Sequence, residues 1–471
     1  MNRPVGREFD NALLVEADRN SFLHPFTQIT DHRANGALVM ASAKGCRITD
    51  ATGREFIDAA AGLWCVNVGY GREEISEAIA AQSRLLPYFH TFNGVGNEPG
   101  IRLAEKLLSL APAGMKRVFY GSSGSDANDT AVKLLWHYNI CRGKPNKRKI
   151  ISRNYAYHGV SVASGSLSGI PMVHEHFGLP LDFVRHVSRP DLYRDAPERQ
   201  CHTEEAYSAW LADELDRMIV AEGPDTVAGF VAEPVMGTGG VLPPPRGYFE
   251  ALQQVLDRHD VHLISDEVIT GYGRTGTWFA SEPSGMRPDI VLTAKGVTSG
   301  YLPLSAVFVG EKVWSAIEDA SRDGRVFAHG FTYSGHPTCA AAALANIDII
   351  EREGLVDRVA DIAPIFRDVI TAAVGDLPLV GDIRTAGFMM GVELVADRTS
   401  KARLPAGAKP AGRVALAARR HGVLVRGLPN SDIIALSPPF IVTEEELGII
   451  ASGLKRAIEE VTQELRSEGA M

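Results

Sequence analysis

Cysteine is scarce in this chain of 471 residues, and its spacing excludes two common roles. The five cysteines are odd in number, lie far apart and never form a Cys-x-x-Cys pair. Disulfide frameworks of secreted proteins and structural zinc sites both need closely and regularly spaced cysteines. We therefore expect reduced thiols in a cytoplasmic protein. The five residues are Cys46, Cys65, Cys141, Cys201 and Cys339.

An excess of positive charge and long apolar runs are also lacking. The chain has 48 Lys and Arg against 57 Asp and Glu, a formal net charge of −9, which argues against a nucleic-acid-binding surface. Residues 1–14 hold no apolar core of signal-peptide length, and no apolar run approaches a membrane span. With 45% hydrophobic and 22% charged residues, the chain has a globular composition, and neither nucleic acid nor membrane is expected as a partner.

The chain does contain short apolar strands that alternate with helical stretches from about residue 65 to residue 340. This alternation predicts an α/β fold with a mostly parallel sheet. We expect a large domain over 61–340 and a small α+β domain built from 1–60 and 341–471. The predicted strands are 117–120, 149–152, 229–232, 262–265 and 290–293.

Two helices and one loop are predicted in the last third of the chain. Pro337 suits a first helical turn and Gly354 a helix end, so we expect an alanine-rich helix between them. Thr443 and Glu446 form the capping-box pattern at the start of the last helix, whose apolar face is expected to pack on its own domain. A flexible loop is expected over 397–412.

Two charged residues follow predicted strands. Asp266 comes directly after strand 262–265, and Lys295 closely follows strand 290–293. Their separation, 295 − 266 = 29 residues, is about the length of one βαβ step. Ligands of open α/β sheets bind outside the carboxyl ends of the strands, so both side chains are expected in one crevice. An amine and a carboxylate placed this way suit pyridoxal phosphate (PLP), which needs a Schiff-base lysine and a partner for its pyridinium nitrogen.

Residues 121–128, Gly-Ser-Ser-Gly-Ser-Asp-Ala-Asn, lie between a predicted strand and a helix-prone stretch. The unpaired N–H groups of a first helical turn bind anions, and glycine lets a phosphate approach the backbone closely. The Ser125 hydroxyl adds a donor. A plain helix cap is the alternative, but the position after a core strand favours a phosphate site.

Three further segments carry a polar side chain with two possible roles, one functional and one structural. Tyr157, beside His158, either stacks on a flat cofactor or is an ordinary core tyrosine. Glu233, after strand 229–232, either contacts the cofactor's ring hydroxyl or an arginine, or lies at the rim. Thr332, in the segment 331–337, either donates to a phosphate or caps the following helix.

Two motif-like stretches are interpreted as structural. His174 and His176 lack the i, i+4 spacing of a helical zinc motif, so a solvated loop without a metal is expected there. Residues 271–276 resemble a phosphate loop without its Gly-Lys-Ser/Thr ending, and we expect a tight loop that supports the site.

In order and spacing, these segments resemble the class III aminotransferases, the ω-transaminase group of fold-type I PLP enzymes. The resemblance runs from about Leu23 to the last helix and implies a seven-stranded, mostly parallel sheet flanked by helices, plus the small domain. It also implies a homodimer with shared active sites, in which Thr332 and Phe92 would serve the partner's site, and leaves a tetramer open. The motifs that carry it are 62–71, 123–129, 157–159, 265–268, 293–296 and 331–337.

The resemblance also implies roles for individual residues. Lys295 would hold PLP as a Schiff base and shuttle the proton, while Asp266 would keep the pyridine nitrogen protonated. Tyr157 would stack on or beside the ring, Val268 would press its opposite face, and Thr332 would reach the phosphate from the other subunit. The implied cofactor-binding residues are Ser123, Gly124, Ser125, Tyr157, His158, Glu233, Asp266, Val268, Lys295 and Thr332.

The implied reaction is a ping-pong transfer of an amino group from a primary amine or ω-amino acid to a keto acid, with pyruvate as the expected acceptor. Arg426 would pair with the keto acid's carboxylate and swing away for amines that lack one. Polyamines, β-alanine, taurine and amino alcohols all remain open as donors, with a preference for (S)-amines expected. The implied substrate-binding residues are Phe26, Trp64, Phe92, Tyr157 and Arg426.

Other functions remain open on the same scaffold. Decarboxylation-linked transamination, racemase and phospholyase chemistry use the same core motifs, and the aromatic residues with Arg426 favour transamination over them. A non-catalytic binding protein with this fold would have no need for Lys295 and Asp266. The sequence does not identify the pathway.

Overall fold

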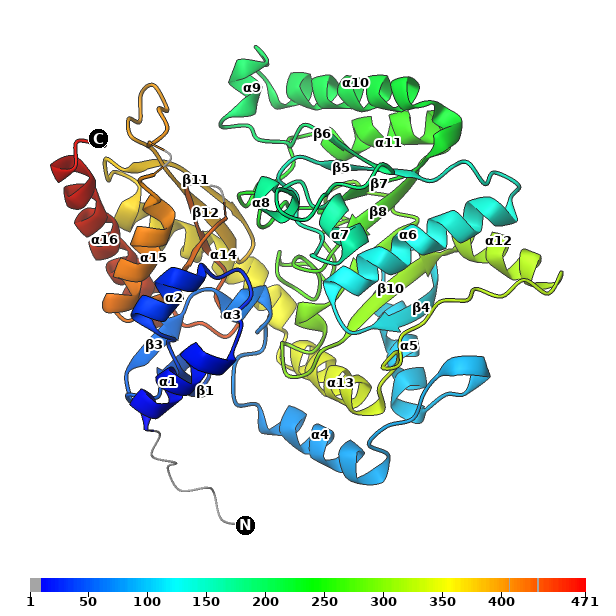
Figure 1. Cartoon of the computed structure of the whole chain (residues 1–471), viewed down its shortest axis with the longest axis horizontal. Coiled ribbons are helices and arrows are strands. Elements are labelled where there is room, and N and C mark those ends of the chain that lie inside the picture. The colour runs from blue at the N-terminus through cyan, green and yellow to red at the C-terminus, as the bar shows by residue number, and fades with distance from the viewer. Residues whose placement is uncertain (1–9, 406, 430–431) are drawn as a thin grey trace.

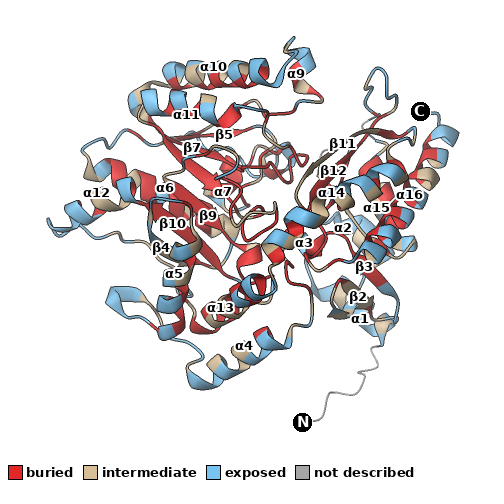
Figure 2. Cartoon of the chain, turned by 180° about the vertical axis from the view of Figure 1, so that it is seen from behind, coloured by how far each residue is buried: buried red, intermediate tan, exposed pale blue. Residues whose placement is uncertain are grey.

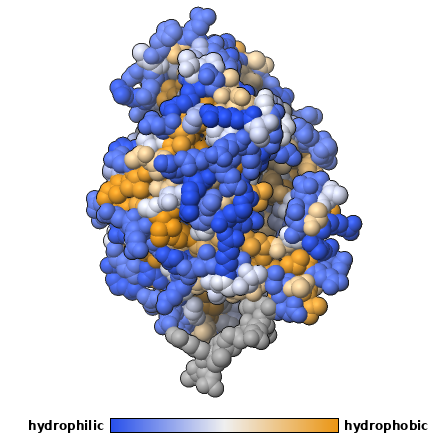
Figure 3. Space-filling view, turned by 90° about the vertical axis from the view of Figure 1, so that its left-hand side faces the viewer, coloured by the Kyte–Doolittle hydropathy of each residue, from blue (hydrophilic) through white to orange (hydrophobic). Residues whose placement is uncertain are grey.

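The computed structural model describes residues 10–405, 407–429 and 432–471 of the chain. Figure 1 shows a large sheet with helices around it on one side of the molecule, and the first and last elements of the chain together on the other side. On the face shown in Figure 3, hydrophilic side chains dominate and hydrophobic ones gather in separate patches. Within the described ranges, none of the helices combines the length and the apolar character needed to cross a membrane.

The large sheet has seven strands in the order β4-β10-β9-β8-β7-β5-β6. All neighbours from β9 to β6 are parallel, whereas β10 runs antiparallel to both β9 and β4. The predicted mostly parallel, seven-stranded sheet is therefore confirmed. The strands are β4 (Met115–Gly121), β5 (Lys149–Arg153), β6 (Val184–Val187), β7 (Val227–Ala232), β8 (His262–Asp266), β9 (Ile290–Thr293) and β10 (Ser305–Gly310).

Helices cover both faces of this sheet. Phe230 and Leu263 share a buried cluster with the helices α10 and α11, while the next residues, Val231 and Ile264, share one with α6, because side chains alternate between the two faces of a strand. Figure 2 shows the buried residues concentrated on the sheet and on the inner sides of the helices. The helices are α5 (Glu98–Leu110), α6 (Gly124–Cys141), α7 (Val162–Leu167), α10 (Glu204–Glu222), α11 (Tyr248–Arg258), α12 (Glu311–Ser321) and α13 (Pro337–Arg352).

The connection from β8 to β9 differs from the expected βαβ step, because residues 267–289 form turns instead of a helix. The buried carboxylate of Glu267 organises these turns by accepting hydrogen bonds from the backbone N–H groups of Ala280 (3.0 Å) and Ser281 (2.7 Å). In the loop 271–276, the buried Arg274 donates to the side chain of Asn67 at 2.7 Å. This loop therefore ties the strand ends to the segment near residue 67.

Segments from both ends of the chain form two smaller sheets, β1-β2-β3-β13 and β11-β12-β15-β14. In the first, β3 pairs in parallel with β13, with Ile57 opposite Val423. The early strands thus share a sheet with a strand from the last fifty residues. The strands are β1 (Met40–Lys44), β2 (Arg47–Asp50), β3 (Glu55–Asp58), β11 (Val380–Ala386), β12 (Met389–Leu394), β13 (Val423–Leu424), β14 (Arg426–Gly427) and β15 (Ile433–Leu436).

In the last third of the chain, two helices begin where the sequence predicts. Pro337 begins α13, and Thr443 caps α16 through the capping box, because Thr443 Oγ1 accepts from the N–H of Glu446 and the Glu446 carboxylate accepts from that of Thr443. One difference is that α15 begins at Pro410, inside the predicted loop. The remaining helices are α1 (Asn11–Ser21), α2 (Ile29–Asn35), α3 (Ala61–Trp64), α4 (Glu73–Leu85), α8 (Pro171–His174), α9 (Asp195–Glu198), α14 (Leu355–Val374), α15 (Pro410–Arg420) and α16 (Glu444–Ser467).

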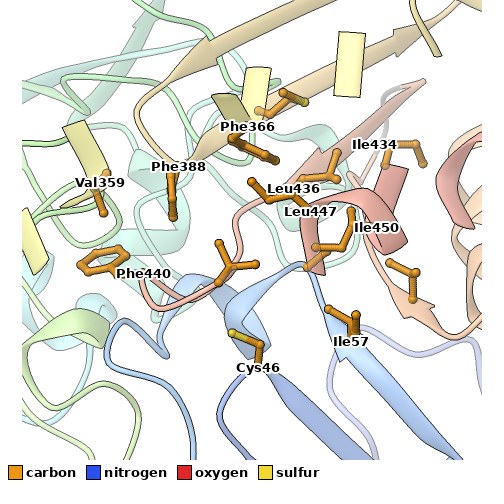
Figure 4. Close-up of a cluster of buried hydrophobic side chains, with 14 of the residues drawn as sticks. Cys46, Ile57, Val359, Phe366, Phe388, Ile434, Leu436, Phe440, Leu447 and Ile450 are labelled. Atoms are coloured by element: carbon orange, nitrogen blue, oxygen red, sulfur yellow. The ribbon is translucent and has the colours of Figure 1, made fainter. Parts of the chain in front are cut away.

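The apolar face of α16 packs in a buried cluster that joins early and late segments (Figure 4). Leu447 and Ile450 from α16 lie in this cluster with Ile57 of β3 and with the aromatic residues Phe388 and Phe440. The predicted stripe of the last helix is thus part of the core.

Candidate functional site

A cavity of about 410 Å³ lies beyond the carboxyl ends of β4, β5, β7, β8 and β9. Parallel strands bring their carboxyl ends to one edge of a sheet, so residues far apart in sequence meet there. Thr332 is the one residue of the expected cofactor set that is not part of the lining. The lining includes Ser123, Gly124, Ser125, Tyr157, His158, Glu233, Asp266, Val268 and Lys295.

Lys295 begins a short 3₁₀ turn directly beyond β9. Its φ angle of 44° is in the left-handed region, a strained conformation that non-glycine residues adopt mainly at functional sites. Burial lowers the pKa of its amine below 10.5, and the charge of Arg426 also lowers it, against the opposite effects of Cys65 and Asp266. A lysine with a lowered pKa is neutral at lower pH, which makes it a usable nucleophile and base.

Asp266 ends β8 with its side chain buried and fully engaged. One carboxylate oxygen accepts hydrogen bonds from His158 Nδ1 (2.7 Å) and Asn128 Nδ2 (2.9 Å), and the other accepts from the N–H of Val268 (3.1 Å). Burial raises the pKa of Asp266, but these hydrogen bonds outweigh it and hold the pKa below its usual range. The site therefore contains a buried carboxylate that stays ionised.

The amino terminus of α6 presents an anion site. Ser123 caps the helix, and the Asp126 carboxylate accepts from the N–H groups of Ser122 (2.8 Å) and Ser123 (3.1 Å). The N–H groups of Gly124 and Ser125 in the first turn cannot bond within the helix and are left for an anion. The helix cap is thus present, in the same segment that is predicted to hold a phosphate.

Gly124 and Ser125 are packed closely against their neighbours. A Cβ atom at Gly124 would lie 3.0 Å from a methyl group of Val268, so only glycine fits there without displacing that side chain. The Ser125 oxygen accepts a hydrogen bond from the N–H of Val160 at 3.2 Å, which leaves its own hydroxyl hydrogen for a ligand.

Glu233 and Tyr157 lie together at the cavity wall. The Glu233 carboxylate accepts from the N–H of Gly237 (2.8 Å) and, more weakly, from that of Tyr157 (3.4 Å). Burial raises the pKa of Glu233. Burial also raises the pKa of the Tyr157 hydroxyl, and the positive charge of Arg426 partly offsets this rise. Glu233 is therefore a buried wall residue and not one of the exposed rim.

Of the expected substrate residues, Trp64 and Arg426 are in contact with each other. The Arg426 guanidinium lies 5.0 Å from the centre of the Trp64 ring, within the range of a cation–π interaction. Trp64 is buried, and the next residue, Cys65, lines the cavity. The two residues are 362 positions apart in the sequence (426 − 64), so only the fold brings them together.

Five expected site residues are not among the described residues that line this cavity: Trp64 and Arg426, which lie beside it, and Phe26, Phe92 and Thr332. Phe26 is 59% exposed and lines a separate apolar cavity with Phe177. Phe92 is 42% exposed, and Thr332 is exposed with its carbonyl oxygen accepting from Tyr88. Phe92 and Thr332 are the two that the sequence assigned to the other subunit.

Asn128 and Cys65 are among the cavity residues that were not expected from the sequence. Asn128 lies one helical turn after Gly124 and donates to the carbonyl oxygen of that residue (3.1 Å) as well as to Asp266. Its i, i+4 spacing from Gly124 was a usable signal. For Cys65, the only signal in the sequence was its position next to Trp64.

Two histidine groups lie away from this cavity. His174 ends the short helix α8 and its Nε2 lies 2.9 Å from the carbonyl oxygen of Gly165, so it is not in the expected solvated loop. His24 and His32 both contact the Asp18 carboxylate, at 2.7 and 2.8 Å.

The cavity residues fit PLP. Lys295 would supply the amine, the ionised Asp266 would supply the partner of the ring nitrogen, and the start of α6 would supply the anion site for the phosphate. Val268, whose N–H donates to Asp266, contacts Gly124 and so lies between these two parts. PLP, a flat ring with a phosphate arm, matches this arrangement of groups.

Comparisons with known proteins agree with this geometry. Residues 29–458 match the family model described as aminotransferase class-III. The chain is 45% identical to the diaminobutyrate–2-oxoglutarate transaminase of Halomonas elongata over 97% of this chain and 98% of that protein. It is 39% identical to the mitochondrial gamma aminobutyrate transaminase 1 of Solanum lycopersicum over 95% and 87%. The crystal structure of the omega transaminase from Pseudomonas jessenii in complex with PMP superposes with a TM-score of 0.93, at 42% identity over 96% and 99%.

Proposed function

The chain belongs to the class III aminotransferases, and from this premise we propose that it moves an amino group from a primary amine or ω-amino acid to pyruvate by a ping-pong reaction. PLP is the cofactor of this family. The observation that carries the proposal is that Lys295, with its lowered pKa, lines the same cavity as the buried, ionised Asp266.

Each role in the reaction falls to a group with suitable chemistry. When bound, the cofactor supplies an electron sink for the substrate carbon. Lys295, whose amine has a lowered pKa, would hold the cofactor and would move the proton at the substrate carbon. Asp266 holds the ring nitrogen protonated, and His158 and Asn128 keep its carboxylate ionised and oriented.

Arg426 is the group for the carboxylate of the keto acid. Arg426 is not among the described lining residues of the cavity, but it lies close enough for its charge to lower the pKa values of Lys295 and Tyr157. The cavity walls include the apolar side chains of Val235 and Ile269 and the acidic residues Glu233 and Asp266. One arginine against apolar and acidic walls favours a keto acid with one carboxylate, such as pyruvate. The relative from Halomonas elongata is named for 2-oxoglutarate, which has two carboxylates and is therefore the acceptor to compare.

The active unit is a homodimer with shared sites. Thr332 and Phe92 lie outside the cavity of their own chain and are exposed. Near them, Tyr88 and Phe89 are also exposed, and Tyr88 contacts the ring of Tyr333. Exposed apolar groups that gather in one region are typical of protein–protein interfaces, which supports the expected contribution of Thr332 and Phe92 to a partner's site.

The test is a half-reaction panel on the purified protein loaded with PLP. Single amines are added without a keto acid and the visible absorbance is followed, and then pyruvate or 2-oxoglutarate is added. Bleaching that pyruvate reverses faster than 2-oxoglutarate supports the proposal, and the fastest donor identifies the amine class. A coloured protein that no amine bleaches would indicate another PLP reaction.

A further inference from the structure

The turn that carries Trp64 and Cys65 has an unusual backbone. Ala61 (φ 46°) and Trp64 (φ 59°) both lie in the left-handed region, with Gly62 (φ 63°) between them. This region is unfavourable for residues with a Cβ atom. Such a turn persists only where surrounding contacts determine it, so the contacts that hold residues 60–64 are important for whatever the turn presents.

The Asp58 carboxylate provides these contacts. Asp58 is 1% exposed, and one of its oxygens accepts from the N–H of Ala60 at 2.9 Å. The other oxygen accepts from the N–H of Gly62 at 2.6 Å and from the hydroxyl of Tyr70 at 2.7 Å. Burial and the charge of Asp58 raise the pKa of Tyr70, so its hydroxyl stays protonated and donates. Three donors thus fix one buried carboxylate at the base of the strained turn.

Asp58 also lies opposite the strand that leads to Arg426. It ends β3 and lies opposite Leu424 of β13, and the N–H of Ala59 donates to the carbonyl oxygen of Leu424 at 2.9 Å. Arg426 follows two residues later, and its guanidinium lies over Trp64. Asp58 therefore lies between the turn that carries Trp64 and β13, which ends two residues before Arg426.

The Trp64–Arg426 pair lies beside the cavity, next to Cys65 of its lining. Trp64 lies close to Gly237, where a Cβ atom would be 3.1 Å from the Trp64 ring, and Gly237 donates to Glu233. Asp58 and Tyr70 themselves are not among the described residues that line the cavity. Their effect on a substrate must pass through Trp64 and Arg426.

We infer that Asp58 and Tyr70 are positioning residues that hold the Trp64–Arg426 pair in register for recognition of the substrate carboxylate. This inference rests on the proposed function, in which Arg426 binds the keto acid. It predicts an effect on substrate binding that is separate from cofactor binding, because the Lys295–Asp266 part of the site has its own supports in His158 and Asn128.

The test compares Asp58→Asn and Tyr70→Phe with wild type in the PLP-loaded protein. Loss of one partner in a buried hydrogen-bond set and relaxation of the turn are expected to raise KM for pyruvate about tenfold in Asp58→Asn and about threefold in Tyr70→Phe. The value of kcat and the visible absorbance of the bound cofactor are expected to stay within about twofold of wild type.

Asp50→Asn is the matched control. Asp50 is also a buried strand-end carboxylate that organises a turn, accepting from the N–H groups of Thr52 (2.9 Å) and Arg54 (3.0 Å), and it is not part of the cavity lining. Its substitution is expected to leave KM for pyruvate unchanged.

Three outcomes would overturn the inference. They are an unchanged KM in Asp58→Asn, an equal rise in Asp50→Asn, and a parallel loss of cofactor absorbance and kcat in Tyr70→Phe, which would indicate a general role in folding. A wild-type protein that transaminates no amine would instead refute the proposed function. In that case, calorimetry of pyruvate binding to the same variants still tests the role of Asp58.

Discussion

The Nδ1 atom of His158 lies 2.7 Å from a carboxylate oxygen of Asp266. Because an ionised carboxylate only accepts hydrogen bonds, this ring nitrogen carries the proton and donates it. Asn128 donates to the same oxygen at 2.9 Å. Two donors thus hold the buried carboxylate and keep its pKa below the usual range, so its negative charge remains available to a cationic group in the cavity.

Replacement of Asp266 by Asn is expected to lower kcat/KM about 100-fold or more, because it removes a preorganised charge from a buried site. Steady-state rates on the cofactor-loaded protein test this. Asp289→Asn is the control. Asp289 also contacts a buried histidine, His262, at 2.9 Å, but it precedes the start of β9, whereas Lys295 follows the end of that strand. An equal loss of activity per folded molecule in both variants would contradict the role of Asp266.

The strand-end residues were predictable from the sequence for a topological reason. Lys295, Asp266 and Glu233 each follow a short apolar run, and parallel strands place their carboxyl ends at one edge of the sheet. The capped start of α6 was predictable because a glycine–serine segment stood between a strand and a helix. Local patterns were therefore sufficient wherever the sheet itself brings the residues together.

Other parts of the site depend on contacts that no local pattern specifies. The Trp64–Arg426 contact needs the parallel pairing of β3 with β13, two short strands separated by most of the chain. The turns between β8 and β9 replaced an expected helix because Glu267, a buried carboxylate, supplies hydrogen-bond acceptors for that loop. Such pairings are properties of the packed chain and not of a window of sequence.

Replacement of Arg426 by Ala is expected to raise KM for pyruvate about 10- to 100-fold, because a charge-assisted contact to the carboxylate is lost. The KM for an aromatic amine without a carboxylate is expected to change much less. Measurement of both half-reactions separates the two effects. Arg420→Ala, which removes an exposed arginine paired with Glu460, serves as the control. Equal effects on both substrates would contradict carboxylate recognition by Arg426.

Replacement of Thr332 by Ala tests the shared site. If Thr332 reaches the phosphate in a partner subunit, the variant is expected to bind PLP about tenfold more weakly, through loss of one hydrogen bond to a charged group. Cofactor titration of the apoprotein measures this, with the exposed Thr399→Ala as the control. Unchanged affinity, or activity in a protein that sediments as a monomer, would refute the contribution across an interface.

The pH dependence of cofactor attachment follows from the lowered pKa of Lys295. Since this pKa lies below 10.5 in the folded protein, the amine loses its proton at lower pH than in an unfolded chain. The rate at which the apoprotein binds PLP covalently is therefore expected to rise with pH and to level off below pH 10.5. Stopped-flow absorbance across pH measures this profile, and a plateau reached only near pH 10.5 would contradict it.

The charge of Arg426 is expected to influence the same pH profile of cofactor attachment. This charge lowers the pKa of Lys295, so Arg426→Ala is expected to raise that pKa and move the plateau to higher pH, while Arg420→Ala leaves it in place.

The stability of the apoprotein is expected to rise with pH for the same reason. Between the pKa of Lys295 in the folded protein and 10.5, the unfolded chain binds more protons, so the apoprotein gains stability as pH rises. Lys295→Met removes this gain, and thermal unfolding of both apoproteins across that range would show whether Lys295 is its source.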